Sequence, residues 1–182
     1  MKWLIASDIH GSALYGRQLL EAFDREGAGR LLLLGDLLYH GPRNDLPGGY
    51  GPKEVIFMLN ERKEQIFCVR GNCEAEVDQM VLGFPVMAEY CLLEAAGRLI
   101  FATHGHKYHL DAPPALGAGS VLLHGHTHVP AKTLTAAGWW YLNPGSVSIP
   151  KEDSPRGYMT LEEGVFCWKT LEGREYDRLE LR

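Results

Sequence analysis

The chain has 182 residues, of which 46% are hydrophobic and 23% charged, a composition that excludes collagen-like, disordered and coiled-coil proteins. The length predicts a single domain over residues 1–182. The 18 basic and 23 acidic residues give a net charge of −5, which argues against extended nucleic-acid binding but is compatible with a small anionic substrate.

The first part of the chain alternates between strand and helix patterns. An apolar stripe from Tyr15 to Phe23 predicts an amphipathic helix that ends near Gly27. Pro52 suits the first turn of a second helix, whose apolar stripe continues toward Arg62. Short apolar runs typical of buried strands flank these helices, at 2–7, 31–34 and 66–69. Their order predicts a βαβαβ unit built on a parallel sheet.

The second half of the chain contains strand patterns at short spacing and little helical periodicity, with one candidate helix at 111–116. The expected strands are 86–93, 98–103, 121–124, 139–143, 158–161 and 165–170. Closely spaced strands of this kind favour a second, largely antiparallel sheet. We therefore expect two packed sheets with helices on the outside.

Polar clusters follow several of the apolar runs, at the strand ends where α/β sheets bind ligands. In chain order they are Asp8-Ile9-His10, Gly35-Asp36, Gly71-Asn72-Cys73-Glu74, His104-Gly105-His106 and Gly125-His126-Thr127-His128. In extended backbone, residues i and i+2 project to the same side about 6.6 Å apart. Asp8 and His10 could then reach one metal ion, and so could His126 and His128.

The ligand types in these clusters point to hydrolytic metal chemistry. Carboxylate, imidazole and carboxamide groups suit manganese, iron, zinc or nickel rather than a structural thiolate zinc site. The seven candidate ligands exceed the needs of one ion, so we expect two ions with Asp36 as the bridge. Two divalent ions and two aspartates leave a net charge of about +2, which attracts a phosphate ester and activates bound water.

Each cluster alone is weak evidence, because a polar residue after a strand is more often a turn or cap residue. The full ordered set resembles the calcineurin-like metallophosphoesterases, whose pattern is D-x-H, G-D, G-N-[H/C]-[E/D], H and G-H-x-H. Three further stretches add to this resemblance. The segment Asn143-Pro144-Gly145-Ser146-Val147 resembles a recurrent stretch of the family. The stretches 40–44 and 76–80 resemble the YfcE-type bacterial phosphodiesterases within it. The resemblance covers nearly the whole chain.

The resemblance implies a four-layer α-β-β-α sandwich and a metal site of two ions. Asp8, His10 and His128 would hold one ion, Asn72, His104 and His126 the other, and Asp36 would bridge them. Manganese is the usual ion of this type, while nickel, zinc, iron and magnesium remain open. Many family members carry histidine after the asparagine, where this chain has Cys73, and a thiol is a poor proton donor to an alkoxide leaving group.

These observations predict a binuclear metal-dependent phosphodiesterase in which a metal-bridging hydroxide attacks phosphorus in line. Asp36, Asn72, Cys73 and His104 are the expected catalytic residues. His40 and Arg43 are candidates for binding a phosphate oxygen. The alternative is that both residues belong to a surface loop without a role in binding. A phosphomonoesterase using the same site is the alternative, and a catalytically silent protein-interaction scaffold is a third interpretation.

The cysteine spacing and the lengths of the apolar runs indicate the cellular compartment of the protein. Cys68, Cys73, Cys91 and Cys167 form neither a CxxC pair nor a dense framework, which favours a reducing compartment. We find no secretory apolar segment and no apolar stretch of about 20 residues. We therefore expect a cytoplasmic protein without membrane contact, with a small phosphodiester as its substrate and with exposed strands through which it could form a homo-oligomer.

Overall fold

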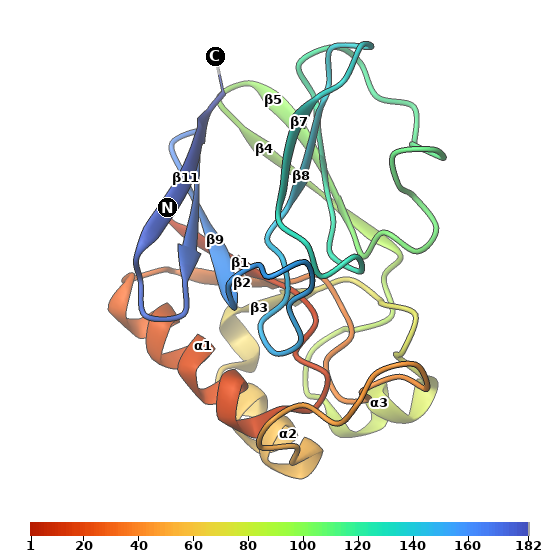
Figure 1. The fold of residues 1–182 in the computed structure, drawn as a ribbon, viewed down its shortest axis with the longest axis vertical. Helices are drawn as coiled ribbons and strands as arrows, with labels where there is room; N and C mark the ends of the chain where they lie inside the picture. Colours follow the sequence, from red (N-terminus) through yellow and green to blue (C-terminus); the bar gives the residue numbers. More distant parts are fainter. Residues whose placement is uncertain (182) are drawn as a thin grey trace.

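The computed structural model describes residues 1–181, and its framework is a pair of β-sheets packed face to face (Figure 1). The first sheet has the strand order β11-β10-β9-β1-β2-β3. Its strands are β1 (Trp3–Ala6), β2 (Arg30–Leu33), β3 (Ile66–Cys68), β9 (Gly157–Glu162), β10 (Val165–Thr170) and β11 (Glu175–Glu180). β1, β2 and β3 are parallel, while β9, β10 and β11 join them through antiparallel pairs.

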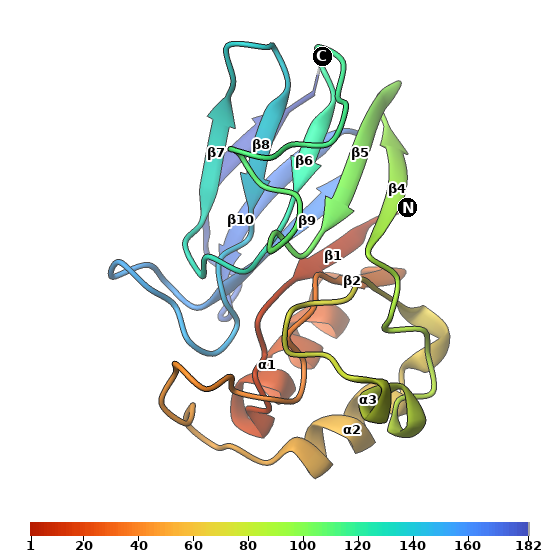
Figure 2. The ribbon, with the colours of Figure 1, turned by 90° about the vertical axis from the view of Figure 1, so that its right-hand side faces the viewer.

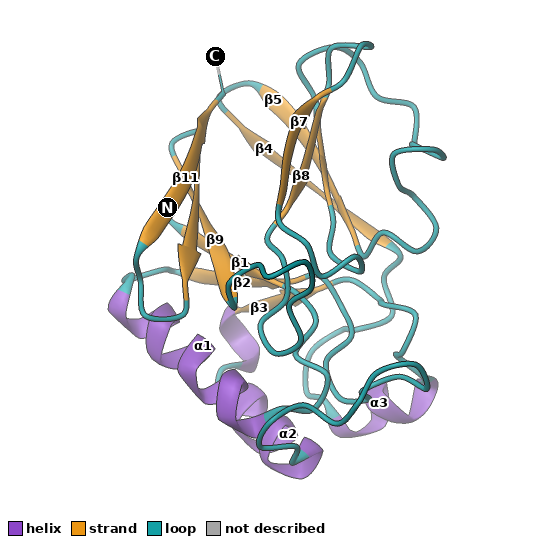
Figure 3. Ribbon diagram, viewed as in Figure 1, coloured by secondary structure: helices purple, strands orange, loops and turns teal. Residues whose placement is uncertain are grey.

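The helices of the predicted βαβαβ unit are confirmed. α1 (Ala13–Arg25) begins where the Ser12 hydroxyl accepts a hydrogen bond from the Tyr15 amide, which satisfies one of the free donors of the first turn. α2 (Pro52–Asn60) begins with its proline, which needs no backbone partner there. The unpredicted helical elements are a short α3 (Glu76–Val81) and a 3₁₀ turn at Lys63–Gln65. The three α-helices lie at one end of the molecule, beside the first sheet (Figure 3).

The second sheet has the order β4-β5-β6-β8-β7 and stands upright in Figure 2. Its strands are β4 (Tyr90–Ala95), β5 (Arg98–Thr103), β6 (Val121–Leu123), β7 (Ala131–Leu134) and β8 (Trp140–Asn143). The expectation of a largely antiparallel sheet is wrong, because β5, β6 and β8 run parallel and only the two outer pairs are antiparallel. The predicted strands at 158–161 and 165–170 form, but they extend the first sheet.

Two hydrophobic cores explain the continuous apolar runs of the sequence. Leu4, Leu31 and Leu33 face the helices, whereas their neighbours Ile5 and Leu32 face the second sheet. A strand covered on both faces has no solvent-facing side chains, and it therefore reads as uninterrupted apolar sequence rather than as an alternating pattern. The predicted α/β fold with two packed sheets is thus confirmed, and among the described residues the α-helices lie beside the first sheet only.

The outer face of the second sheet is covered by the segment 104–120, which contains no helix in the structure of residues 1–181. The candidate helix at 111–116 is wrong because Pro113 and Pro114 lack the amide hydrogens of a helix interior. Tyr108 and Leu116 of this segment pack against Phe101 and neighbouring buried side chains of the sheet. In the described part of the chain, no helix is both long and apolar enough to cross a membrane.

Candidate metal centre

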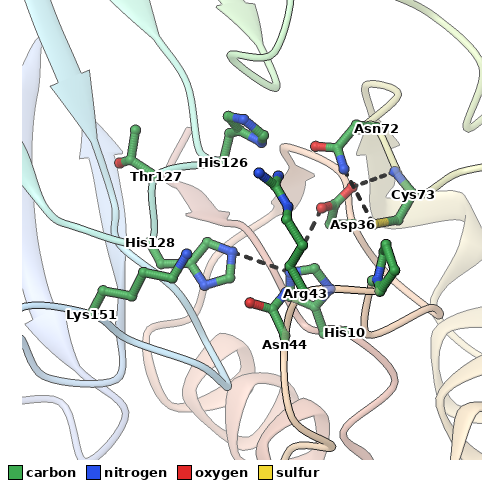
Figure 4. Close-up of a pocket in the computed structure, with 12 residues that line it drawn as sticks. His10, Asp36, Arg43, Asn44, Asn72, Cys73, His126, Thr127, His128 and Lys151 are labelled. Atoms are coloured by element: carbon green, nitrogen blue, oxygen red, sulfur yellow. Dashed lines mark hydrogen bonds and ion pairs between the residues drawn. The ribbon is translucent and has the colours of Figure 1, made fainter.

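All seven candidate ligands lie in loops that leave the carboxyl ends of strands in the two sheets. Asp8 and His10 follow β1, Asp36 follows β2 and Asn72 follows β3. The second sheet contributes His104 after β5, and His126 and His128 after β6. Figure 4 shows five of these side chains, those at positions 10, 36, 72, 126 and 128, around one pocket.

The ligand atoms form two adjoining groups. In the first, Asp8 Oδ1 lies 3.3 Å from His128 Nε2 and 3.5 Å from His10 Nε2. The second group centres on His104 Nε2, which lies 3.4 Å from Asp36 Oδ2, 3.1 Å from Asn72 Oδ1 and 3.2 Å from His126 Nδ1.

Asp36 connects the two groups, because its Oδ2 atom also lies 3.7 Å from His10 Nε2. These groups contain the same residues as the two ligand sets implied by the family resemblance. Asp36 therefore stands between the two groups, within 3.7 Å of His10 and 3.4 Å of His104.

Hydrogen bonds to backbone carbonyls show which ring nitrogens are free to bind a metal. Nδ1 of His10 lies 2.7 Å from the Tyr39 carbonyl, and Nδ1 of His128 lies 2.6 Å from the Ile149 carbonyl. A carbonyl only accepts, so each Nδ1 carries the proton, and in the neutral ring Nε2 then presents a lone pair. These two Nε2 atoms face each other at 3.2 Å.

The same arrangement recurs at His104, whose Nδ1 lies 2.7 Å from the Leu34 carbonyl. Asp8 Oδ1 is buried without a hydrogen-bond partner among the described residues. Lone pairs that face one another beside an unpartnered carboxylate oxygen repel, and a cation between them removes that repulsion. The residues present therefore fit divalent cations.

Electrostatics lead to the same conclusion. Burial would raise the pKa of Asp8, yet its interaction with the neighbouring imidazoles of His10, His128 and His104 holds this pKa well below its usual range. Burial likewise works against a charged His104, but Asp36 and Asp8 raise its pKa to about 9. The field of the two buried carboxylates thus favours positive charge at the position of the ligand nitrogens, whether a proton or a metal ion supplies it.

Five of the ligands occupy the left-handed backbone region. The φ angles are 60° for Asp8, 49° for His10, 56° for Asp36, 65° for His126 and 64° for His128. The expected extended geometry of the two i, i+2 pairs is therefore wrong, although each pair still converges. Such conformations cost about 1–3 kcal/mol each and persist only where surrounding bonds enforce them.

Several of those bonds come from neighbouring loops. The Asp8 amide donates to the Gly35 carbonyl at 3.1 Å, and its own carbonyl accepts hydrogen bonds from the hydroxyls of Ser146 and Ser148 at 2.9 and 3.0 Å. The Asp8 carboxylate in turn accepts from the His126 amide at 3.0 Å. The segment 143–147, which the sequence marked only by its resemblance to the family, thus supports the Asp8 loop together with the following Ser148.

Glu74 joins two ligand loops although it contacts none of the proposed metal positions. Its buried carboxylate accepts backbone hydrogen bonds from Asp36 at 2.9 Å, Leu37 at 2.7 Å and Gly71 at 2.5 Å. Burial, followed by the charge of Asp36, raises its pKa. Glu74 was part of the predicted motif, but its positioning role depends on contacts that no sequence pattern reveals.

Cys73 lies beside Asp36, with its thiol half-buried in the pocket wall. Its amide donates to Asp36 Oδ1 at 2.9 Å, and the Asn72 side-chain amide donates to its sulfur at 3.3 Å. Burial, and then the negative charge of Asp36, raises the pKa of the thiol. The sulfur is consequently a neutral thiol that releases its proton reluctantly.

The pocket above the ligands has a volume of about 410 Å³. Arg43 lines it, as predicted for a phosphate-binding residue, together with the unpredicted Asn44, Thr127 and Lys151. His40 instead lies outside the pocket, in edge-on contact with the rings of Tyr39 and Tyr50. Lys151 could not be found from the sequence because it follows no apolar run and belongs to no recognised motif.

Comparison with known proteins agrees with this geometry. The model of the calcineurin-like phosphoesterase superfamily domain matches residues 1–164. Phosphodiesterase YfcE of Escherichia coli K12 is 46% identical over 165 residues, which cover 91% of this chain and 89% of that protein. A solved structure of Yfce, described as a phosphoesterase from E. coli, has a TM-score of 0.95 with 42% identity over 100% of both chains.

A more distant structure, wild-type Vps29 of Entamoeba histolytica complexed with zinc, has a TM-score of 0.60 with 17% identity over 100% of both chains. At that identity it shows a shared fold only. The family match spans most of the described residues, and the E. coli relative is aligned over nine-tenths of the chain. The chain therefore belongs to the calcineurin-like phosphoesterase superfamily, a family of phosphate-ester hydrolases.

Proposed function

We propose that the protein is a binuclear metal-dependent phosphodiesterase. The observation that carries this proposal is the pair of ligand groups whose ring nitrogens and carboxylate oxygens converge on either side of Asp36. Asp8, His10 and His128 would hold one ion, Asn72, His104 and His126 the other, and Asp36 both. Two divalent ions there would supply a hydroxide for in-line attack on phosphorus and would offset the charge of the phosphate.

The remaining residues of the pocket bind and orient the substrate. Arg43 offers a planar set of donors to a phosphoryl oxygen. The Cys73 thiol is a weak acid, so the departing alcohol receives little help from it. This supports a preference for diesters with good leaving groups, such as aryl esters.

Manganese is the ion we propose, because nitrogen and oxygen donors suit it and because Cys73, which lies close enough to His10 and Asp36 to share an ion with them, is a neutral thiol rather than a thiolate. The test is to remove metal with a chelator, add back Mn²⁺, Ni²⁺, Zn²⁺, Fe²⁺ or Mg²⁺ singly, and assay an aryl phosphodiester beside an aryl phosphomonoester. Higher kcat/KM on the diester supports the proposal. Higher kcat/KM on the monoester would assign the site to a phosphatase.

A substitution at the bridge connects turnover to the metals. Asp36→Asn keeps the shape of the side chain but removes its charge, and we expect a loss of at least about 100-fold in turnover together with bound metal. The matched control is Asp45→Asn, which removes the same charge from an exposed position. Full turnover by metal-free protein would instead contradict the metal mechanism.

We further propose one catalytic domain over residues 1–182 in a reducing, cytoplasmic setting. The four cysteines are unpaired in the structure, which fits such a compartment. A scaffold function is disfavoured by the complete ligand set, and metal-dependent turnover distinguishes the two.

A further inference from the structure

Arg43 and Lys151 bring positive charge to the pocket from two separate segments of the chain. Arg43 lies in the loop between β2 and α2, and Lys151 follows β8. Both line the pocket, and in Figure 4 the Arg43 side chain reaches toward Asp36 and His126 while Lys151 lies beside His128. The two cations thus stand at different sides of the same opening.

Neither side chain is neutralised by an ion pair within the structure of residues 1–181. Other cations of the protein are paired, such as Arg17 with Glu54 and Lys132 with Asp177. Glu152 and Asp153 follow Lys151 but are exposed and do not line the pocket. In a chain with a net charge of −5, two unpaired cations facing one opening indicate an anionic ligand.

The charge of the loaded site exceeds what a simple diester can neutralise. Two divalent ions, two aspartates and the attacking hydroxide leave about +1, and Arg43 and Lys151 raise this to about +3. A dialkyl or alkyl aryl phosphodiester carries a single negative charge. Arg43, whose side chain reaches toward Asp36 and whose guanidinium has five N–H donors, can contact the scissile phosphate and a further anion on the substrate together, and Lys151 can contact that further anion.

We propose that Arg43 and Lys151 form a second anion subsite, so that the preferred substrate is a phosphodiester carrying a further anionic group on one of its alcohols. This inference rests on the proposed diesterase function and narrows its substrate class. The shared chemistry is a second anion, which a phosphoryl group or a carboxylate can provide. Thr127 and Asn44, which also line the pocket, offer neutral hydrogen-bonding groups around it.

The test compares matched p-nitrophenyl diesters on the manganese-loaded protein. The second ester group of each substrate is 2-carboxyethyl, 2-phosphonoethyl or 2-carbamoylethyl. The 2-carbamoylethyl group is neutral and has nearly the size of the 2-carboxyethyl group. We expect kcat/KM for at least one anionic ester to exceed that of the neutral ester by about tenfold or more, mainly through KM. The ester with the higher kcat/KM shows whether the subsite takes a carboxylate or a phosphoryl group. The ratio of anionic to neutral kcat/KM should fall as the salt concentration increases, because Arg43 and Lys151 are both solvent-exposed.

Variants assign the preference to the two residues. In the double variant R43Q/K151Q we expect the ratio of anionic to neutral kcat/KM to fall to about one, and each single variant to lose part of it. The control K53Q/R174Q removes the same total charge from exposed positions outside this pocket. It should retain the wild-type ratio. Equal use of the three esters by the wild type, or an unchanged ratio in R43Q/K151Q, would overturn the inference.

A binding measurement separates this inference from the proposed reaction. Methyl 2-carboxyethyl phosphate, methyl 2-phosphonoethyl phosphate and methyl 2-carbamoylethyl phosphate have poor leaving groups and serve as ligands in titration calorimetry. We expect the tighter anionic ligand to bind about tenfold more strongly than the amide, and R43Q/K151Q to abolish the difference. Absence of p-nitrophenol release with this preference intact would refute the diesterase and leave the subsite standing. Equal Kd values would overturn the subsite whatever the turnover.

Discussion

Replacing Glu74 by glutamine tests whether one buried carboxylate positions two metal-ligand loops. In the native protein one carboxylate oxygen accepts from the amides of Asp36 and Gly71, and the other accepts from Leu37. Glutamine has nearly the same shape but only one acceptor oxygen. If that oxygen keeps the Asp36 and Gly71 bonds, the new NH₂ group faces the Leu37 amide, and two donors then oppose each other.

The cost follows from these contacts. One charge-assisted hydrogen bond, worth about 1.5–3 kcal/mol, is lost, and the other two become neutral bonds worth about 1 kcal/mol each. Burial of the Glu74 charge and its repulsion by Asp36 both raise the pKa of Glu74, and the removal of that charge offsets part of this loss. We expect the free energy of unfolding to fall by about 2–4 kcal/mol.

The assay is urea unfolding of metal-free protein, followed by calorimetric titration of the folded variant with Mn²⁺. Glu76→Gln, an exposed glutamate two residues away, is the matched control and should change stability by less than about 0.5 kcal/mol. We also expect weaker Mn²⁺ binding by Glu74→Gln, because the Asp36 and Asn72 loops are no longer held together. Stability and Mn²⁺ affinity both equal to those of the control would refute the positioning role.

Further predictions concern a glycine, an ion pair and the thiol. A Cβ at Gly71 would overlap the Asp36 carboxylate, so Gly71→Ala should reduce bound metal measured by mass spectrometry, and unaltered metal content would count against the close approach. Burial raises the pKa of Glu26, but Lys169 lowers it below the ordinary value overall. Glu26→Gln should therefore destabilise the protein most above about pH 4.5, with the gap in urea unfolding closing as pH falls and Glu26 is protonated; a constant gap would exclude this linkage. Cys73→His should increase kcat/KM for alkyl diesters more than for aryl diesters, because imidazole protonates a poor leaving group better, and unchanged selectivity would contradict that role.

The elements that the sequence predicted are those whose pattern is local. α1 and α2 show an apolar stripe and a recognisable beginning, and β1 and β2 are continuous apolar runs because both of their faces are buried. β7 and β11 escaped prediction because they are edge strands whose residues are mostly exposed and polar. Without a buried face, no apolar periodicity marks a strand.

Membership of a sheet depends on pairing between distant segments, which periodicity does not encode. β9 lies in the second half of the sequence, yet it pairs with β1 in a register that joins Trp3 to Leu161. The prediction that first-half and second-half strands form separate sheets failed at this pairing. For the same reason, the contact of Ser146 and Ser148 with the Asp8 carbonyl could not be predicted from the sequence.

For the candidate site, residue type and position in the sequence were enough to choose the side chains, whereas the backbone geometry was not predictable. Aspartate, histidine and asparagine after successive strands led to seven candidate ligands that the structure brings together. The left-handed backbone at five of them was not foreseen, and neither was Lys151 at the pocket. His40 was chosen because it is near Asp36 in sequence, but the turn between them directs its ring toward Tyr39 and Tyr50.

The strained backbone also bears on how the site acquires its metals. The left-handed ligands are held by bonds that involve no metal, such as Asp8 to Gly35 and His10 to Asp36 between backbone atoms. The free energy of folding therefore offsets the backbone strain, and the candidate ligand atoms already lie close together before a cation binds. What remains unfavourable in the metal-free protein is the repulsion among converging lone pairs and carboxylates, and a cation relieves that repulsion directly. Preorganisation of this kind favours binding of the ions and leaves little movement of the ligand loops to accompany it.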